Sequence, residues 1–202
     1  MGYQINHCGI LILAAGQSKR LGSPKQLLSF HGETLISKVT DLASGLGTFP
    51  VICVLGAYAD EVRNAIRQTE IHLVWNDDWE EGMASSIRMG VNELRHRFPT
   101  VDGIMILVCD QPFLDREIIE NLLSAQAQSG LPAAAACYQG KLGTPALFHQ
   151  SLFPELIELK GDKGARLLLE GIRDQVSQVH FDAGSIDIDS KEDYQRLLDQ
   201  DK

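Results

Sequence analysis

The chain has 202 residues, of which 44% are hydrophobic and 22% charged, and its formal net charge is −9. This apolar content suits one core, so we expect a single domain over residues 1–202. The acidic balance disfavours binding to nucleic acid or to an anionic membrane, so any anionic ligand must be held by local positive charge. The apolar run near the start is too short to span a bilayer. The spacing of Cys8, Cys53, Cys109 and Cys137 indicates reduced thiols and a cytoplasmic protein.

Apolar runs and helical spacing alternate along the chain. Helices are expected over 34–46, 59–69, 83–97, 115–129, 163–171 and 191–199, and strands over 9–14, 50–55, 71–75, 103–108 and 133–138. This alternation predicts an α/β fold with a parallel sheet covered on both faces. The later segments "TPALF" and "VSQVHF" lack a crossover of the usual length. We therefore expect a mostly parallel, mixed sheet with one antiparallel strand.

The first expected strand leads into the loop "AAGQSKRLGSPK". In open α/β sheets, ligands bind outside the carboxyl ends of the strands. The small residues at 14–16 let backbone N–H groups approach a ligand. Arg20 adds a planar guanidinium group that can bridge phosphate oxygens, and Lys25 adds a compact positive charge. The loop matches neither the P-loop nor the dinucleotide motif. The hypothesis is a phosphate-binding loop, and the alternative is a solvated surface loop.

An acidic residue, Asp110, directly follows the apolar strand at 103–108 and should face the same crevice. Its alternative role is to cap the next helix, although Asp115 is better placed for that. A carboxylate in the crevice favours a metal ligand over a cap.

A second acidic segment, "SIDIDSKEDY", alternates Asp187, Ile188 and Asp189. Residues two apart on an extended segment share a face, and Ser190 suits the N-cap of the following helix. Mg²⁺ prefers oxygen ligands, one or two of them protein carboxylates. We expect Asp110 together with one of Asp187 or Asp189 to hold Mg²⁺.

The stretch "LAAGQSKRLGSPKQLL" closely resembles the signature of nucleotidyltransferases that join a nucleoside triphosphate to a phosphorylated acceptor and release pyrophosphate. The family includes the molybdenum cofactor guanylyl- and cytidylyltransferases. The resemblance implies a Rossmann-like three-layer α/β nucleotidyltransferase fold, with the first loop wrapped around the triphosphate. The residues it implies for nucleotide binding are Leu13, Ala14, Ala15, Gly16, Arg20, Lys25 and Asp110. In relatives, the acid after a "CDxP" strand and one in the late acidic segment bind the metal. The resemblance therefore implies Asp110 and Asp189 as metal ligands, with Asp187 as the alternative to Asp189; Lys191 here replaces a proline of that segment.

Four further segments, "NDDWEEGMASSIRMGV" (76–91), "CDQP", "GTPALF" (143–148) and "GDKGAR" (161–166), resemble the molybdenum cofactor cytidylyltransferase group. The resemblance implies a base pocket formed by Ala15, Met83 and Ser86. An ordinary helix start with serine capping is the alternative for that segment. Thr144 stands where histidine is common in the cytidylyl group, a departure that concerns the pterin substrate and leaves the phosphate chemistry unchanged.

Two cations near residue 163 are candidates for binding the acceptor. Lys163 and Arg166 lie three apart at an expected helix start, where together they can hold an acceptor phosphate. The alternative is a simple turn leading into the helix.

The expected reaction is transfer of CMP from CTP to a phosphorylated acceptor of molybdopterin type, with Mg²⁺ as cofactor. Arg20 would neutralise the β and γ phosphates and Lys25 the α phosphate, which makes them the catalytic candidates. Transient contact with a molybdoenzyme is an expected partner interaction. The alternatives are guanylyl transfer, cytidylyl transfer to another phosphorylated acceptor, and a non-catalytic nucleotide-binding chaperone for a molybdoenzyme.

Overall fold

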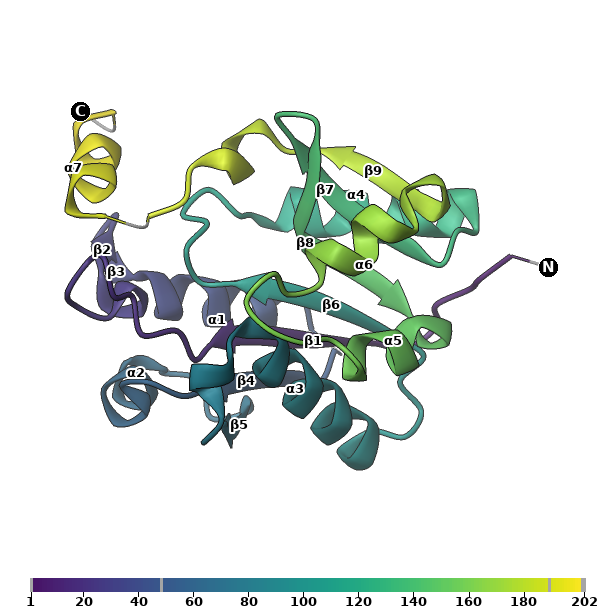
Figure 1. Cartoon of the computed structure of the whole chain (residues 1–202), viewed down its shortest axis with the longest axis horizontal. Helices are drawn as coiled ribbons and strands as arrows, with labels where there is room; N and C mark the ends of the chain where they lie inside the picture. The colour runs from purple at the N-terminus through teal and green to yellow at the C-terminus, as the bar shows by residue number, and fades with distance from the viewer. Residues whose placement is uncertain (1, 48, 189, 201–202) are drawn as a thin grey trace.

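The computed structural model describes residues 2–200 of the chain except 48 and 189. In this part of the chain a seven-stranded sheet has the order β5-β4-β1-β6-β8-β7-β9 (Figure 1). Its strands are β1 (Cys8–Ala14), β4 (Val51–Leu55), β5 (His72–Trp75), β6 (Gly103–Val108), β7 (Ala133–Tyr138), β8 (Lys141–His149) and β9 (Val176–His180).

The sheet is parallel apart from β8, which runs antiparallel to both β6 and β7. The expectation of a mixed sheet with one antiparallel strand is confirmed. The local cause is the connection between β7 and β8, where Gln139 and Gly140 have φ of 50° and 71°. Two successive positive φ values make a two-residue hairpin turn, so the chain must return beside β7 in the opposite direction.

The helices are α1 (Leu35–Gly45), α2 (Ala59–Ala65), α3 (Met83–Arg97), α4 (Arg116–Ser129), α5 (Phe153–Ile157), α6 (Arg166–Gly171) and α7 (Lys191–Gln200). Single 3₁₀ turns occur at η1 (Lys25–Leu27), η2 (Trp79–Glu81), η3 (Gln150–Leu152), η4 (Arg173–Gln175) and η5 (Asp182–Ser185). No helix of the described residues is long and apolar enough to cross a membrane.

Three helices differ from the expectation. The five-residue α5 was not expected, because so short a run carries no helical period. α2 ends at Ala65, since the next residue, Ile66, is extended with ψ of 117°. α6 begins at Arg166 rather than 163, because Gly161 and Gly164 have positive φ and form a turn.

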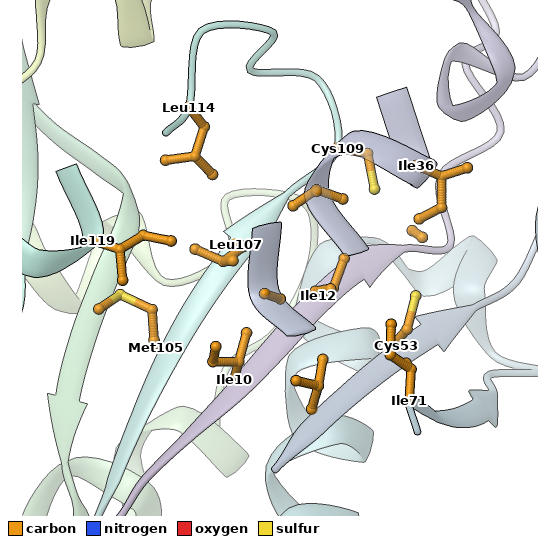
Figure 2. Close-up of a cluster of buried hydrophobic side chains, with 14 of the residues drawn as sticks. Ile10, Ile12, Ile36, Cys53, Ile71, Met105, Leu107, Cys109, Leu114 and Ile119 are labelled. Carbon is orange, nitrogen blue, oxygen red and sulfur yellow. The ribbon is translucent and has the colours of Figure 1, made fainter. Parts of the chain in front are cut away.

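Helices cover both faces of the sheet. On one face, Ile36 of α1 and Ile119 of α4 pack with Ile10, Ile12 and Leu107 of the central strands (Figure 2). On the other face, α3, α5 and α6 bury a second cluster against the same strands. With the sheet between two helical layers, binding groups are left to the loops at the strand ends.

Close packing of α3 on β1 positions the first loop and the start of α3. A Cβ on Gly90 of α3 would lie 2.2 Å from a methyl carbon of Leu11, and one on Gly9 of β1 would lie 2.6 Å from Leu94. Glycine at both positions lets the helix approach the strand.

The carboxyl-terminal helix packs on a small hairpin rather than on the sheet (Figure 1). The hairpin consists of β2 (Ser29–Phe30) and β3 (Glu33–Thr34). Ile188 and Leu197 are buried against Phe30, and the Tyr194 hydroxyl donates to the Ser29 carbonyl at 2.6 Å. These contacts hold the late acidic segment beside the chain that follows the first loop.

Candidate active site

The carboxyl ends of β1 and β6 open into a cavity of about 400 Å³. The cavity is lined by the first loop, by the start of α3 and by Asp110, which follows β6. Of the residues implied for nucleotide binding, those that line the cavity are Leu13, Ala15, Gly16, Arg20, Lys25, Met83, Ser86 and Asp110. Ala14 does not line the cavity. It is buried, and its carbonyl accepts a hydrogen bond from Gln26 Nε2.

The first loop is folded around Ser18, which has φ of 55°. The Ser18 carbonyl accepts from the N–H of Leu21 at 3.0 Å and from that of Gly22 at 3.2 Å, and its hydroxyl accepts from the Lys25 N–H at 3.1 Å. The backbone N–H groups of residues 15 to 19 have no hydrogen-bond acceptor among the residues that the structure describes. Several free N–H groups beside two cationic side chains form a site for an anion.

Lys25 and Asp110 form an ion pair in the wall of the cavity. Lys25 Nζ lies 2.5 Å from Asp110 Oδ2, and each side chain is only 20% exposed. Partial burial strengthens the attraction between the charges relative to bulk water. A cation and a carboxylate in contact thus form part of the cavity lining.

The helix-cap role that competed for Asp110 belongs to Asp115. The Asp115 carboxylate accepts from the Ile118 N–H at 3.0 Å at the start of α4. Asp110 lies outside that cap and lines the cavity instead.

The start of α3 carries an oriented hydroxyl. Asn76 is 2% exposed, and its Nδ2 donates to Ser86 Oγ at 2.9 Å and to Ser85 Oγ at 2.8 Å. Ser85 in turn donates to the Gly82 carbonyl, whereas Ser86 lines the cavity. Neither serine caps α3, whose N-cap is Gly82 without a side-chain bond. Because Ser86 Oγ already accepts from Asn76, its hydrogen is left to donate into the cavity.

Several cavity residues were not expected from the sequence, among them Trp79, Glu80 and Asp162. Gly82 has φ of 113°, and a Cβ there would lie 2.2 Å from Asp162 Oδ1, so only glycine fits. The Ala84 N–H donates to the Gly161 carbonyl at 3.0 Å, which docks the 161–164 turn onto α3. The sequence signal for this contact was the glycine on each side, in "EGM" and "KGDKG".

The cations expected at the acceptor lie outside the cavity. Lys163 and Arg166 do not line it, and Arg166 Nε lies 2.8 Å from Glu170 Oε1 on the exposed face of α6. The same turn reaches the cavity through Asp162 instead. The role of Lys163 and Arg166 in binding the acceptor stays a prediction.

Of the two late aspartates, Asp189 lies outside the described residues. Asp187 is exposed and does not line the cavity. Burial raises the pKa of the Tyr138 hydroxyl, and the negative charges of Asp187 and Asp110 raise it further, so both carboxylates lie near this one phenol.

Among the described residues, no group of three histidine, cysteine or acidic side chains could hold a metal ion. Carboxylate oxygens are nevertheless the ligands that a hard divalent cation accepts alongside phosphate oxygens.

A cationic turn of free N–H groups facing a carboxylate, at the carboxyl edge of a mostly parallel sheet, defines a nucleotide-binding α/β protein. The chain matches the model of the MobA-like NTP transferase domain over residues 10–179 and belongs to that family. It is a nucleotidyltransferase of this family, and its Rossmann-like fold is confirmed.

Curated relatives carry different names. The chain is 31% identical to "Nicotine blue oxidoreductase" of Paenarthrobacter nicotinovorans, over 93% of this chain and 95% of that protein. It is 30% identical to "Purine catabolism protein PucB" of Bacillus subtilis, over 91% and 92%. It is also 30% identical to a "Molybdenum cofactor guanylyltransferase" of Pseudomonas entomophila, over 68% and 67%.

Among solved structures, that of Rv0371c from Mycobacterium tuberculosis is similar, with a TM-score of 0.83, 30% identity, and 97% and 99% of the two chains covered. A manganese complex of Rv0371c superposes with a TM-score of 0.79 at 27% identity, covering 96% and 99%. A divalent metal is therefore found in a protein of this fold.

Proposed function

We propose that the protein transfers CMP from CTP to a phosphorylated small-molecule acceptor of molybdopterin type and releases pyrophosphate. Residues 1–202 would act as a single nucleotidyltransferase domain. The observation that carries the proposal is the Lys25–Asp110 pair, 2.5 Å apart beside a loop of unpartnered N–H groups. This arrangement suits a polyanion accompanied by a cation.

The reaction needs little beyond positioning and charge neutralisation. A terminal phosphate oxygen of the acceptor attacks the α-phosphorus of CTP; one P–O bond forms there while the bond to the bridging oxygen breaks, and pyrophosphate leaves. The attacking oxygen is already ionised, so no general base is required. Lys25 would neutralise charge at the α phosphate and Arg20 at the β and γ phosphates.

Mg²⁺ fits the chemistry of the site, because Asp110 supplies carboxylate oxygens to the cavity and Mg²⁺ prefers oxygen ligands. Asp110 would hold the ion together with Asp189 or Asp187. When bound, the ion neutralises phosphate charge that the side chains alone leave uncompensated.

The preference for cytosine rests on the chemistry at the start of α3. The Ser86 hydroxyl can donate to an acceptor on the pyrimidine edge. The carboxylates of Glu80 and Asp162, which also line the cavity, can accept from the amino group that cytosine carries and uracil lacks. Guanine also carries amino hydrogens, and a relative is named as a guanylyltransferase. GTP is therefore the second candidate donor.

Pyrophosphate release with Mg²⁺ and molybdopterin, assayed separately with the four nucleoside triphosphates, tests the proposal. We expect release with CTP and little with the others. Release with GTP alone would assign the protein to guanylyl transfer. CTP turnover with another phosphorylated compound, but not with molybdopterin, would change the acceptor. Nucleotide binding without release under all conditions would favour a nucleotide-binding chaperone, and a molybdoenzyme would then be its partner.

A further inference from the structure

Gln26, the residue after Lys25, is a buried glutamine whose amide bridges two carbonyl oxygens. Its side chain is 2% exposed, lies on η1 and lines the cavity. Nε2 donates to the Ala14 carbonyl and to the Gly16 carbonyl, both at 2.9 Å. One amide thus ties the end of the first loop back to the end of β1.

These two bonds set the direction of two peptide planes. In a trans peptide, the carbonyl of one residue and the N–H of the next point in opposite directions. Because the carbonyls of Ala14 and Gly16 point toward Gln26, the N–H groups of Ala15 and Gln17 point away from it. Both of these residues line the cavity, and neither N–H has an acceptor among the described residues. The loop is left with two oriented donors.

The oxygen of the same amide, Gln26 Oε1, is buried without a hydrogen-bond partner within the described part of the chain. Leaving a buried acceptor unpaired is unfavourable for stability. An apolar side chain of similar length would avoid that penalty but would leave the carbonyls of Ala14 and Gly16 without this donor.

We propose that Gln26 is a positioning residue that holds the N–H groups of Ala15 and Gln17 toward the phosphate oxygens of a nucleoside triphosphate. It acts through the loop and not by touching the reacting atoms. The inference rests on the nucleotide-binding part of the proposed function and is independent of which base or acceptor is used. Inorganic tripolyphosphate, which has neither, is therefore the probe.

The chain contains a matched control in Gln126. This glutamine is also 2% exposed, and its Nε2 donates to the carbonyls of Tyr3 at 2.6 Å and Leu131 at 2.9 Å. It does not line the cavity. Replacing either glutamine removes the same kind of buried amide, but only one of the two holds the first loop.

The experiment compares Gln26→Met and Gln126→Met by calorimetric titration with tripolyphosphate and Mg²⁺, and by urea unfolding. We expect both to unfold at lower urea, and only Gln26→Met to bind tripolyphosphate more weakly, by roughly tenfold, because two donors lose their orientation. Wild-type affinity in Gln26→Met, or equal weakening in Gln126→Met, would overturn the proposal. Absence of binding by the wild type would overturn it too.

A measurement on the wild type keeps the test open if Gln26→Met does not fold. On adding tripolyphosphate, the amide resonances of Ala15 and Gln17 should move downfield as their N–H groups bind phosphate. Unchanged resonances at saturating ligand would refute the inference. If these resonances move but no nucleoside triphosphate is turned over, the positioning role stands and the proposed transferase reaction fails.

Discussion

Lys25 Nζ and Asp110 Oδ2 lie 2.5 Å apart although 85 positions separate the two residues in sequence. The contact is possible because β1 and β6 are parallel neighbours in the sheet, so the chain leaves both strands at the same edge. A cationic loop and a carboxylate are thereby held together by the sheet itself.

The first prediction concerns this pair. Lys25→Ala and Asp110→Ala should fold normally and slow pyrophosphate release by about two to three orders of magnitude, because in the proposed reaction each removes a charge that would contact the nucleotide or its metal. Circular dichroism checks the fold and a release assay checks the rate. Arg67→Ala, which removes an exposed cation away from the cavity, is the control and should match the wild type. Wild-type turnover in either site variant would refute the assignment.

The second prediction concerns two adjacent serines. Ser86→Ala should raise the KM for CTP roughly tenfold, through loss of one hydrogen bond to the base. Ser85→Ala removes a hydroxyl that Asn76 holds in the same way but that does not line the cavity. Steady-state kinetics on both should show the KM effect in Ser86→Ala alone. An equal change in the two variants would indicate an effect through Asn76, not through the base.

The third prediction uses close packing behind the first loop. A Cβ on Gly56 would lie 2.8 Å from the Ala15 carbonyl oxygen and 2.7 Å from Trp79 Cβ. Gly56→Ala should therefore lower the free energy of unfolding by about 1–3 kcal/mol and weaken nucleotide binding by displacing the loop. Gly171→Ala is the matched control, since nothing lies within 4 Å of a Cβ at that position. Urea unfolding and nucleotide titration measure the two effects, and tight binding by Gly56→Ala would contradict the prediction.

The fourth prediction concerns thiol reactivity. Burial raises the pKa of Cys8 and of Cys53 to about 12, so at pH 8 only about 10⁻⁴ of each is thiolate. Burial likewise raises the pKa of Cys109. In the native protein we expect Ellman's reagent to modify only Cys137, which is partly exposed, and to modify all four thiols in denaturant. Rapid native reaction of more than one thiol would show that the core opens.

The fifth prediction concerns acid stability. Burial opposes ionisation of Asp102, but N–H donation from His7 and Asn6 outweighs it and the pKa of the carboxyl is lowered. The stabilisation is therefore present above the unfolded-state pKa, about 3.9, and is lost as pH falls through the lower folded-state value. Asp102→Asn should lower the free energy of unfolding by about 1–3 kcal/mol at pH 7. Denaturant melts from pH 7 to pH 3 should show the difference shrinking below pH 4; a constant difference would exclude this linkage.

Several features could be predicted from the sequence because they depend on nearby residues. Asp115 and Ser190 were recognised as caps from local spacing, and their hydroxyl or carboxylate oxygens accept the expected N–H groups. The strand 103–108 was placed correctly because its apolar run is bounded by polar residues. The helix expected from 163 began later, because two glycines with positive φ override the helical spacing.

The site was predictable only in part. Lys25 and Asp110 were both expected at strand ends, since position after a buried strand is visible in one dimension. Glu80 and Asp162 were not expected in the cavity, because the docking of the 161–164 turn on α3 depends on glycine contacts between distant segments. Lys163 and Arg166, which were chosen for their spacing, lie outside the cavity, and their role in binding an acceptor stays a prediction.

The order of residues alone was enough to specify an α/β chain with a cationic loop after its first strand and a carboxylate after its fourth, because hydrophobic period and strand-end chemistry are local properties. Folding was needed to decide which groups meet. The contact between Lys25 and Asp110 joins residues 85 positions apart, and the bonds by which Asn76 orients Ser86 and Gln26 holds two carbonyls span 10 to 12 positions across irregular turns. Such contacts depend on strand order and helix packing, and no local pattern encodes them.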